Sequence, residues 1–363
     1  MDAEQELNIT SCIEKLFSYQ SKNYIFIYTP PKVGSTTLVS SLRISLGKSY
    51  NIIHIHDEVM LSVLTGIKGI SVNDIIKYLG SHDNKVFVID VYRTPVERKM
   101  SEFFEKISPY HFNNSEENIK NYSIKRISDR FNKIFPHIEN DDHYFEKYNI
   151  SDPVPFDFEN KYTIQIINNV NYIKIRLCDS HMWTTILSTI FQNDIVLITD
   201  YQTERKNIGE LYKRFKLEYR LPINFFEELK SSKYFEFYYN EKERNSYLDS
   251  WRSRLSHSTF QPYTSDEFKF YMQVCLENQY INDIQLEHYI DNGCFCKYCS
   301  VKRKDIYFSA KKGETHFVKM IHTEVIHEIN EIRNKKITQF IKNTKTNNSN
   351  KKYTRNQFDI QLK

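Results

Sequence analysis

The sequence has no apolar run of the ~18 residues that a membrane-spanning helix needs. Residues 1–23 also lack the apolar core of a secretory signal. We therefore expect no membrane span and predict a cytoplasmic protein. An excess of one charge is missing too, since 50 basic residues are balanced by 46 acidic ones. A formal net charge of +4 gives no argument for a specific nucleic-acid partner.

Cysteine is scarce, with six residues in the chain. Cys12, Cys178 and Cys275 are scattered, which does not make a disulfide framework. Thiols in a reducing compartment fit this spacing better. The other three cysteines are crowded into a short segment, as Cys294, Cys296 and Cys299.

These three thiolates could supply most of a tetrahedral structural zinc site. The fourth ligand would be one of His288, Cys275 and His316. The second half of a zinc motif is missing, so free thiols in a tight turn are the other interpretation.

A strand, a basic turn and a helix start follow one another over residues 24–43, which read YIFIYTPPKVGSTTLVSSLR. Residues 24–28 form a dense run of β-formers, and two prolines then end the strand. From Thr36 the pattern is helical, with Leu38 and Leu42 on one face. The start of such a helix can hold an anionic group, because its first N–H groups have no intrahelical partner and its dipole is positive there.

The turn itself carries candidate anion ligands. Gly34 lets the backbone come close, Lys32 adds a positive charge, and three hydroxyl donors follow: Ser35, Thr36 and Thr37. The nucleoside-triphosphate P-loop needs an earlier glycine and places its lysine after the second one. Here the lysine precedes the only glycine of the turn, which disfavours a kinase or NTPase. Taken alone, the turn could also be an ordinary one with a solvated lysine.

A second strand-to-helix segment lies at residues 85–107, KVFVIDVYRTPVERKMSEFFEKI. Residues 86–91 indicate a buried strand, and Thr94 is a suitable cap for the helix that follows. Arg93 is left at the carboxyl end of the strand, where ligands bind in doubly wound sheets. Two strand ends that carry Lys32 and Arg93 predict a cleft for two phosphate groups.

Together, the two segments resemble the sulfotransferases that use 3′-phosphoadenosine 5′-phosphosulfate (PAPS). TPPKVGSTTL is similar to their 5′-phosphosulfate loop. VYRTPVERKMSEFF is similar to their 3′-phosphate motif, an arginine followed eight residues later by a serine, as Arg93 and Ser101 are. Among the branches, the segments most resemble carbohydrate sulfotransferases and a group of capsular polysaccharide synthesis proteins. The resemblance covers residues 24–107 and fades beyond residue 200. Thr94 departs from the aspartate common after that arginine, which its capping role explains.

The resemblance implies an α/β fold with a P-loop-like parallel sheet flanked by helices, and PAPS as the sulfuryl donor. Lys32 would neutralise charge on the leaving nucleotide, while Arg93 and Ser101 would hold its 3′-phosphate. The 5′-phosphosulfate would be held by Gly34, Ser35, Thr36 and Thr37. A carbohydrate hydroxyl is the expected acceptor, and the transfer itself needs no metal. The sequence indicates no oligomeric state.

A candidate general base comes from residues 50–55, which predict a strand ending near His54 and His56. Strand alternation sends both histidines to one side. Histidine suits a base because its ordinary pKa lies near neutrality. The His-x-His pattern resembles the base-bearing motif of uronyl 2-O-sulfotransferases, where the second histidine, here His56, serves; His54 is the substitute. Both could instead be satisfied polar residues at a strand end.

Four parts are expected along the chain. They are an N-terminal extension, a nucleotide-binding α/β domain, a mostly helical subdomain and a disordered basic tail, at residues 1–20, 21–200, 201–342 and 343–363. Within the subdomain we predict helices at 240–254, 264–290 and 315–341. The polar residues 108–159 form either a wall of the acceptor site or a surface excursion.

Later β signals complete the predicted α/β domain. Residues 162–167 and 172–177 predict a hairpin, followed by a helix at 180–191 and a strand at 195–199. Arg176 resembles an arginine near the end of a late strand in many sulfotransferases, whose role there varies.

Two other function classes stay open. The chain could be a degenerate sulfotransferase fold that acts as a binding or structural protein, with the thiols and the basic tail as contact surfaces. It could also be a kinase with a divergent loop, which the lack of a clear second-strand aspartate for magnesium opposes. Binding of 3′-phosphoadenosine 5′-phosphate (PAP), compared with ATP, separates these classes.

Overall fold

The computed structural model describes residues 3–17, 21–105, 107–112, 115–135, 137–138, 142–198 and 203–257. These residues form two compact units, each discontinuous in sequence. The first unit contains the described residues up to Arg98, those between 142 and 198, and Ser231–Leu248. The second contains those between 99 and 138, between 203 and 230, and from 249 to 257. This division differs from the contiguous one at residue 200 that the sequence predicts.

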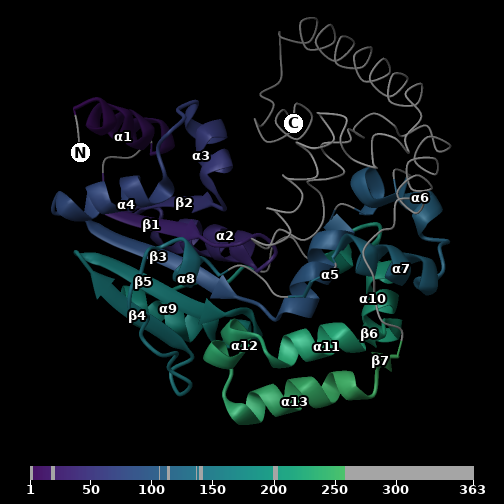
Figure 1. Ribbon diagram of the computed structural model, residues 1–363. Coiled ribbons are helices and arrows are strands. Elements are labelled where there is room, and N and C mark those ends of the chain that lie inside the picture. Colours follow the sequence, from purple (N-terminus) through teal and green to yellow (C-terminus); the bar gives the residue numbers. More distant parts are fainter. Residues whose placement is uncertain are drawn as a thin grey trace, which may run out of the picture. The chain divides into compact units, whose positions relative to one another are not determined.

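A mostly parallel five-stranded sheet is the centre of the first unit (Figure 1). Its order is β2-β1-β3-β5-β4, and only β4 runs antiparallel to its neighbour. The strands are β1 (Asn23–Tyr28), β2 (Asn51–Ile55), β3 (Lys85–Tyr92), β4 (Tyr162–Ile167) and β5 (Val170–Arg176). Central β1 and β3 are buried along nearly their whole length, as expected for strands covered on both faces. The predicted α/β class with a parallel sheet flanked by helices is thereby confirmed.

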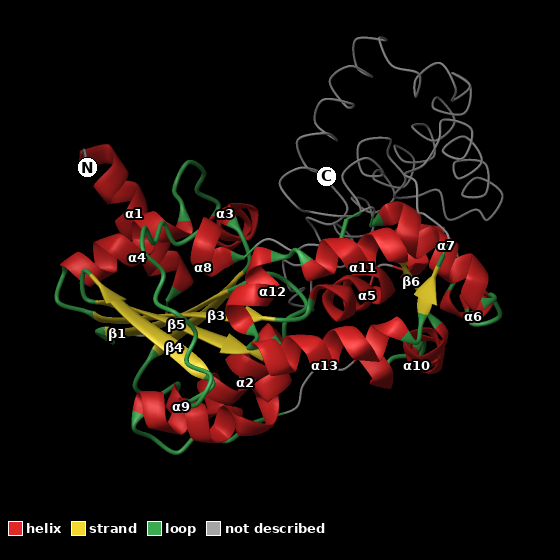
Figure 2. Cartoon of the chain, turned by 60° about the horizontal axis from the view of Figure 1, so that its bottom comes forward, coloured by secondary structure: helices red, strands yellow, loops and turns green. Residues whose placement is uncertain are grey.

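Helices cover both faces of this sheet (Figure 2). Phe26 and Val88 face a core shared with α1 (Ala3–Leu16), α3 (Glu58–Thr65) and α4 (Val72–Ser81). Ile25 and Ile89 face a second core with α2 (Ser35–Leu46) and α9 (Trp183–Phe191). The residues predicted as an N-terminal extension include α1, which buries Ile9 and Cys12 in the first core.

Short elements complete the first unit. They are α8 (His143–Glu146), the 3₁₀-helix η2 (Leu177–Met182), α12 (Lys233–Tyr238) and the first part of α13 (Glu241–Arg252). Asn240 caps α13, since its side-chain oxygen accepts a hydrogen bond from the Glu243 backbone N–H at 2.9 Å. Ser71 caps α4, because Ser71 and Asp74 form a capping box.

The second unit is mainly helical. The helix α5 (Pro95–Glu105) enters it after Arg98. The π-helix η1 (Ile107–Phe112), α6 (Glu116–Ile119), α7 (Ile124–Ile134), the 3₁₀-helix η3 (Thr203–Arg205), α10 (Gly209–Glu218) and α11 (Ile223–Lys230) follow, with a small sheet of β6 (Leu221–Pro222) and β7 (Leu255–Ser256). Aromatic rings hold this unit together: the Phe131 ring lies 5.5 Å from Phe215 and 5.3 Å from Tyr219.

The strand predicted at residues 195–199 is wrong for the described residues 195–198, which form no strand. Two serine hydroxyls of α2 accept hydrogen bonds from backbone N–H groups of this segment instead. The Val196 N–H donates to Ser45 Oγ at 2.9 Å, and the Ile198 N–H donates to Ser41 Oγ at 2.8 Å. The Val196 and Ile198 N–H groups are therefore not available to a strand ladder.

The predicted hairpin is present, but its turn is shorter than expected. Only Asn168 and Asn169 separate β4 from β5, and both have positive φ, 49° and 64°. Two consecutive left-handed residues are typical of a type I′ turn, which matches the twist of the two strands. β5 therefore begins at Val170.

Several predictions lie outside the described residues. They are the zinc ligand candidates Cys294, Cys296, Cys299, His288, Cys275 and His316, the helices at 264–290 and 315–341, and the tail at 343–363. In the part of the chain that the structure describes, Cys12 and Cys178 are free thiols. No helix among the described residues is both long enough and apolar enough to cross a bilayer.

Candidate anion-binding site

The loop between β1 and α2, residues 29–34, has an alternating backbone. φ is positive at Lys32 (67°) and at Gly34 (90°), and it is not positive at Val33 between them or at Ser35 after them. Alternation of left- and right-handed residues turns successive N–H groups toward a common side, which makes an anion-binding concavity called a nest. The alternating sign of φ from Lys32 to Ser35 is compatible with such a concavity.

The nest leads directly into the N-terminus of α2. Gly34 is the N-cap residue, and no side chain caps the helix. The first N–H groups of a helix have no intrahelical acceptor, and the helix dipole adds partial positive charge at this end. The nest and the helix end therefore present one continuous set of backbone donors to an anion.

Packing as well as φ requires glycine at position 34. A Cβ atom there would lie 2.9 Å from Leu177 Cδ1 and 3.1 Å from Trp183 Cη2. Trp183 is itself fixed, because its indole Nε1–H donates to the Arg176 carbonyl at 3.1 Å. The loop thus rests closely on η2 and the start of α9.

Two arginines that follow β3 hold adjacent carbonyl groups of the loop. Arg93 Nη1 donates to the Lys32 carbonyl at 2.7 Å, and Arg98 Nε donates to the Pro31 carbonyl at 3.1 Å. The structure brings Arg93 to the Lys32 segment through a contact with the loop backbone, and the cleft for two phosphate groups stays a prediction. Contact of Arg93 with a phosphate stays a prediction. Sequence reasoning missed Arg98, whose only signal was its place one helical turn after Thr94.

A buried carboxylate lies beneath the start of the loop. Asp90 on β3 is fully buried and accepts a hydrogen bond from Thr29 Oγ1 at 2.7 Å. Its other oxygen pairs with Lys174 Nζ at 2.6 Å, and Lys174 also pairs with Asp142 at 2.7 Å. Burial, opposed by the charge of Lys174 and reinforced by that of Asp90, raises the pKa of Asp142. Both carboxylate oxygens of Asp90 are therefore bonded within the protein, and the group is not accessible to solvent.

His56 is held against the first residue of the loop. Its Nδ1 lies 2.6 Å from the Thr29 carbonyl oxygen. A carbonyl can only accept, so Nδ1 carries the proton and Nε2 is the basic nitrogen of the neutral ring. This tautomer is the one that a general base at this strand end would use.

His54 has a different environment from its neighbour. Its ring centre lies 4.4 Å from that of His56, at 82°. Burial, His56 and Arg43 lower the pKa of His54 to about 3. Its Nε2 is buried with no hydrogen-bond partner among the described residues. A histidine with so low a pKa accepts a proton poorly, so His56 is the better of the two candidates.

His143 on α8 supports His56 and was missed by sequence reasoning. Its Nε2–H donates to the His56 carbonyl at 2.8 Å, and its ring packs edge-on against Tyr28 at 4.9 Å. Burial lowers the pKa of His143 to about 3, so the ring is neutral. Nothing in the local pattern links His143 to a strand end that lies 87 residues earlier.

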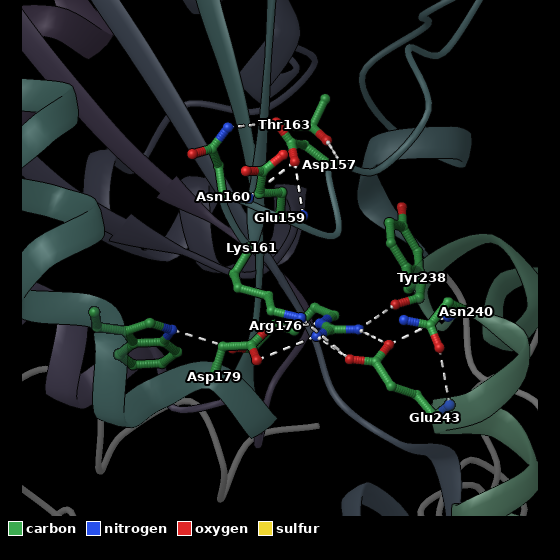
Figure 3. Close-up of polar contacts among 11 residues, drawn as sticks. Asp157, Glu159, Asn160, Lys161, Thr163, Arg176, Asp179, Tyr238, Asn240 and Glu243 are labelled. Atoms are coloured by element: carbon green, nitrogen blue, oxygen red, sulfur yellow. Dashed lines mark hydrogen bonds and ion pairs between the residues drawn. The ribbon is translucent and has the colours of Figure 1, made fainter.

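The side chain of Arg176, at the end of β5, is buried and its guanidinium is bound by other groups of the protein (Figure 3). Its guanidinium pairs with Asp179 at 2.6 Å and with Glu243 of α13 at 2.8 Å, and donates to the Tyr238 carbonyl at 2.7 Å. Burial alone would lower the pKa of Arg176, but the bonds to Glu243 and Asp179 raise it. The arginine ties Tyr238 and Glu243 to the carboxyl end of β5 within the same unit.

Ser101 is the other residue predicted to bind the 3′-phosphate. Ser101 lies on α5 with a buried side chain, in the part of that helix that belongs to the second unit. Its contact with a 3′-phosphate stays a prediction. Among the described residues, no group of three or more histidine, cysteine, aspartate or glutamate side chains is arranged to hold a metal ion.

Comparisons of the chain with protein-family models, with curated proteins and with solved structures each found no match.

Proposed function

We propose that this chain binds PAPS and transfers its sulfuryl group to a hydroxyl acceptor. One observation carries the proposal: φ alternates in sign from Lys32 to Ser35, at an N-terminus of α2 that no side chain caps. Such a set of backbone donors suits a terminal phosphate or phosphosulfate. The sequence around it resembles the 5′-phosphosulfate loop.

Asp90 supports PAPS over a nucleoside triphosphate. A triphosphate site needs an acidic side chain near the loop to hold magnesium. Asp90 lies on the strand beside the loop strand, but it is buried and paired with Lys174. Sulfuryl transfer needs no such ion, since the group carries less charge than a phosphoryl group. The burial and pairing of Asp90 therefore support a sulfuryl donor that needs no metal ion.

The transfer follows an in-line course. The acceptor oxygen forms a bond to sulfur while the bond from sulfur to the bridging phosphate oxygen breaks, and PAP leaves with that electron pair. Lys32 neutralises the charge that develops on the bridging oxygen. His56 takes the acceptor proton on Nε2. Arg93 and Ser101 hold the 3′-phosphate, and the resemblance favours a carbohydrate hydroxyl as the acceptor.

Calorimetry with PAP tests the binding half of this proposal. We expect PAP to bind without magnesium and ATP to bind more weakly, with or without it. Tighter binding of magnesium–ATP would instead favour a divergent kinase. Incubation with radiolabelled PAPS and a panel of glycans, phenols and peptides tests the transfer half. Binding of PAP without transfer to any acceptor would indicate a binding protein on the same fold.

Replacement of Lys32 by alanine tests whether this lysine stabilises the charge on the leaving nucleotide. We expect Lys32→Ala to lower the transfer rate by about a hundredfold or more, because a group that meets developing charge acts mainly on the transition state. PAP affinity should fall much less. Lys48→Ala, at an exposed lysine of the same unit, is the control and should keep the wild-type rate. Wild-type turnover in Lys32→Ala would disprove this role.

A further inference from the structure

Arg98 has a place in the site that differs from that of Arg93. Both donate to loop carbonyls, of Pro31 and Lys32 respectively. Arg93 is half-buried, whereas Arg98 is only 5% exposed. We infer that Arg98 is a positioning residue, which holds residues 29–34 in their anion-binding conformation without touching the anion. The inference rests on the anion-binding loop of the proposed function.

The burial of Arg98 supports this role. A guanidinium taken out of water costs free energy unless it is well hydrogen-bonded, so it is seldom placed in a core for packing alone. Here its Nε–H points to a backbone carbonyl of a loop, 67 residues earlier in the chain. A charge-assisted hydrogen bond of this kind fixes the orientation of the Pro31 peptide unit.

The orientation of the Pro31 peptide decides whether the loop attracts an anion. Pro31 immediately precedes Lys32, where the backbone turns left-handed at 67°. A peptide unit presents N–H on one side and carbonyl oxygen on the other, and the oxygen repels an anion. Holding the Pro31 and Lys32 carbonyls on the arginines keeps both oxygens away from the N–H side of the nest. The positive charge of Arg98 also adds to the attractive potential there.

Without Arg98 the loop would still fold, but it would sample other conformations. A non-glycine residue in the left-handed region is strained, so Lys32 keeps this conformation only while its surroundings enforce it. The anion would then have to reorder the loop on binding, which weakens its apparent affinity. The defect should appear as lost affinity at unchanged stability of the unit.

The experiment measures binding of inorganic pyrophosphate and of PAP to the full chain by calorimetry. The variants are Arg98→Met, which keeps the length of the side chain, and Arg98→Gln, which keeps a donor without the charge. Arg43→Met is the matched control, because Arg43 Nη2 also donates to a backbone carbonyl of this unit, that of Ile52 at 3.3 Å, away from the loop. Thermal melting is recorded for each.

We expect Arg98→Met to weaken pyrophosphate and PAP binding by on the order of tenfold at a nearly unchanged melting temperature. The affinity of Arg98→Gln should lie between that of Arg98→Met and that of wild type, and Arg43→Met should bind both anions as wild type does. If Arg98→Met fails to fold, the affinity of Arg98→Gln decides whether Arg98 has the positioning role. Wild-type affinity in the folded Arg98 variants would overturn the inference, as would affinity that falls only in step with melting temperature.

The two proposals fail in distinguishable ways. If wild type binds pyrophosphate but not PAP, the nucleotide assignment is wrong, and the Arg98 variants still test the loop with pyrophosphate. If wild type binds PAP and the Arg98 variants bind it equally well, only the positioning role is wrong. If wild type binds neither anion, both proposals are wrong.

Discussion

At Gly34 two physical requirements coincide. The residue needs a positive φ of 90° so that the loop can turn into α2, and it needs no side chain because Leu177 and Trp183 fill the space beside it. The sequence predicts the first requirement from a glycine between a strand and a helix. It cannot predict the second, because η2 and α9 come about 140 residues later and reach the loop only through the fold.

Gly34→Ala should abolish tight anion binding by this loop. A Cβ at that position costs about 1 kcal/mol for the left-handed backbone and also forces Leu177 or Trp183 to move. We expect PAP affinity to fall by more than about tenfold and the melting temperature to fall as well. Gly66→Ala is the control, because Gly66 has a similar φ of 71° with no atom within 4 Å of an added Cβ. Equal PAP affinity in the two variants would contradict this account.

Residue patterns also predicted His56 as a candidate base, but they did not predict the residues that contact it. A His-x-His at a strand end is visible in the sequence, whereas the contacts that distinguish His56 from His54 are not. Those contacts are the Thr29 carbonyl on His56 and the burial of His54. Arg98 and His143 gave no usable signal, because single basic residues in helices are common and their partners lie far away in sequence.

At the scale of elements, strands and helices with strong local patterns were predictable. The four strands of the parallel set are short apolar runs bounded by turn residues. Their ends were predicted within one residue, except that β5 begins two residues earlier than predicted. Residues 195–198 have the same apolar pattern without being a strand. Their donors are used by α2 hydroxyls, and hydrophobic periodicity carries no information about donors.

Ser41→Ala tests this use of a serine in place of a strand ladder. Ser41 is fully buried and its Oγ accepts the Ile198 N–H, so alanine leaves that donor without its acceptor. We expect a loss of about 1–2 kcal/mol in unfolding free energy and faster amide exchange at Ile198. Ser49→Ala, at an exposed position in the same unit, should change neither. Unchanged exchange at Ile198 in Ser41→Ala would show that this hydrogen bond contributes little.

At the scale of the whole molecule, the sequence predicted the α/β class but not the division into units. A reading along the chain assigns contiguous domains, and composition does change near residue 200. The structure instead assigns residues 231–248 to the first unit, where Glu243 pairs with Arg176 across 67 positions. Burial alone would raise the pKa of Glu243, but Arg176 lowers it to about 2. Ion pairs between residues so far apart in sequence depend on the tertiary fold, and no rule of sequence spacing predicts them.

The stability of the first unit should fall on mild acidification, because the half-buried His54 and the buried His143 are neutral in the folded chain. Folding lowers both pKa values from 6.5 to about 3, so between these values the unfolded chain binds more protons than the folded one. Their contribution is complete above pH 6.5 and is lost as pH falls toward about 3. Glu243 adds a further loss between about pH 4.5 and 2, because its folded pKa is also lowered. We therefore expect melting temperature to fall steadily from pH 7 to pH 4.5.

His54→Gln distinguishes this cause from general acid destabilisation. The variant removes one of the two neutral rings, so its melting temperature should depend less steeply on pH than that of wild type across pH 4.5–6.5. His82→Gln is the matched control, since His82 lies exposed after α4, and it should keep the wild-type slope. Equal slopes in all three proteins would assign the acid sensitivity to carboxylates instead. A flatter slope in His54→Gln alone would mean that this strand-end histidine stays unprotonated down to low pH in the folded chain, which is the premise for proposing His56 rather than His54 as the base.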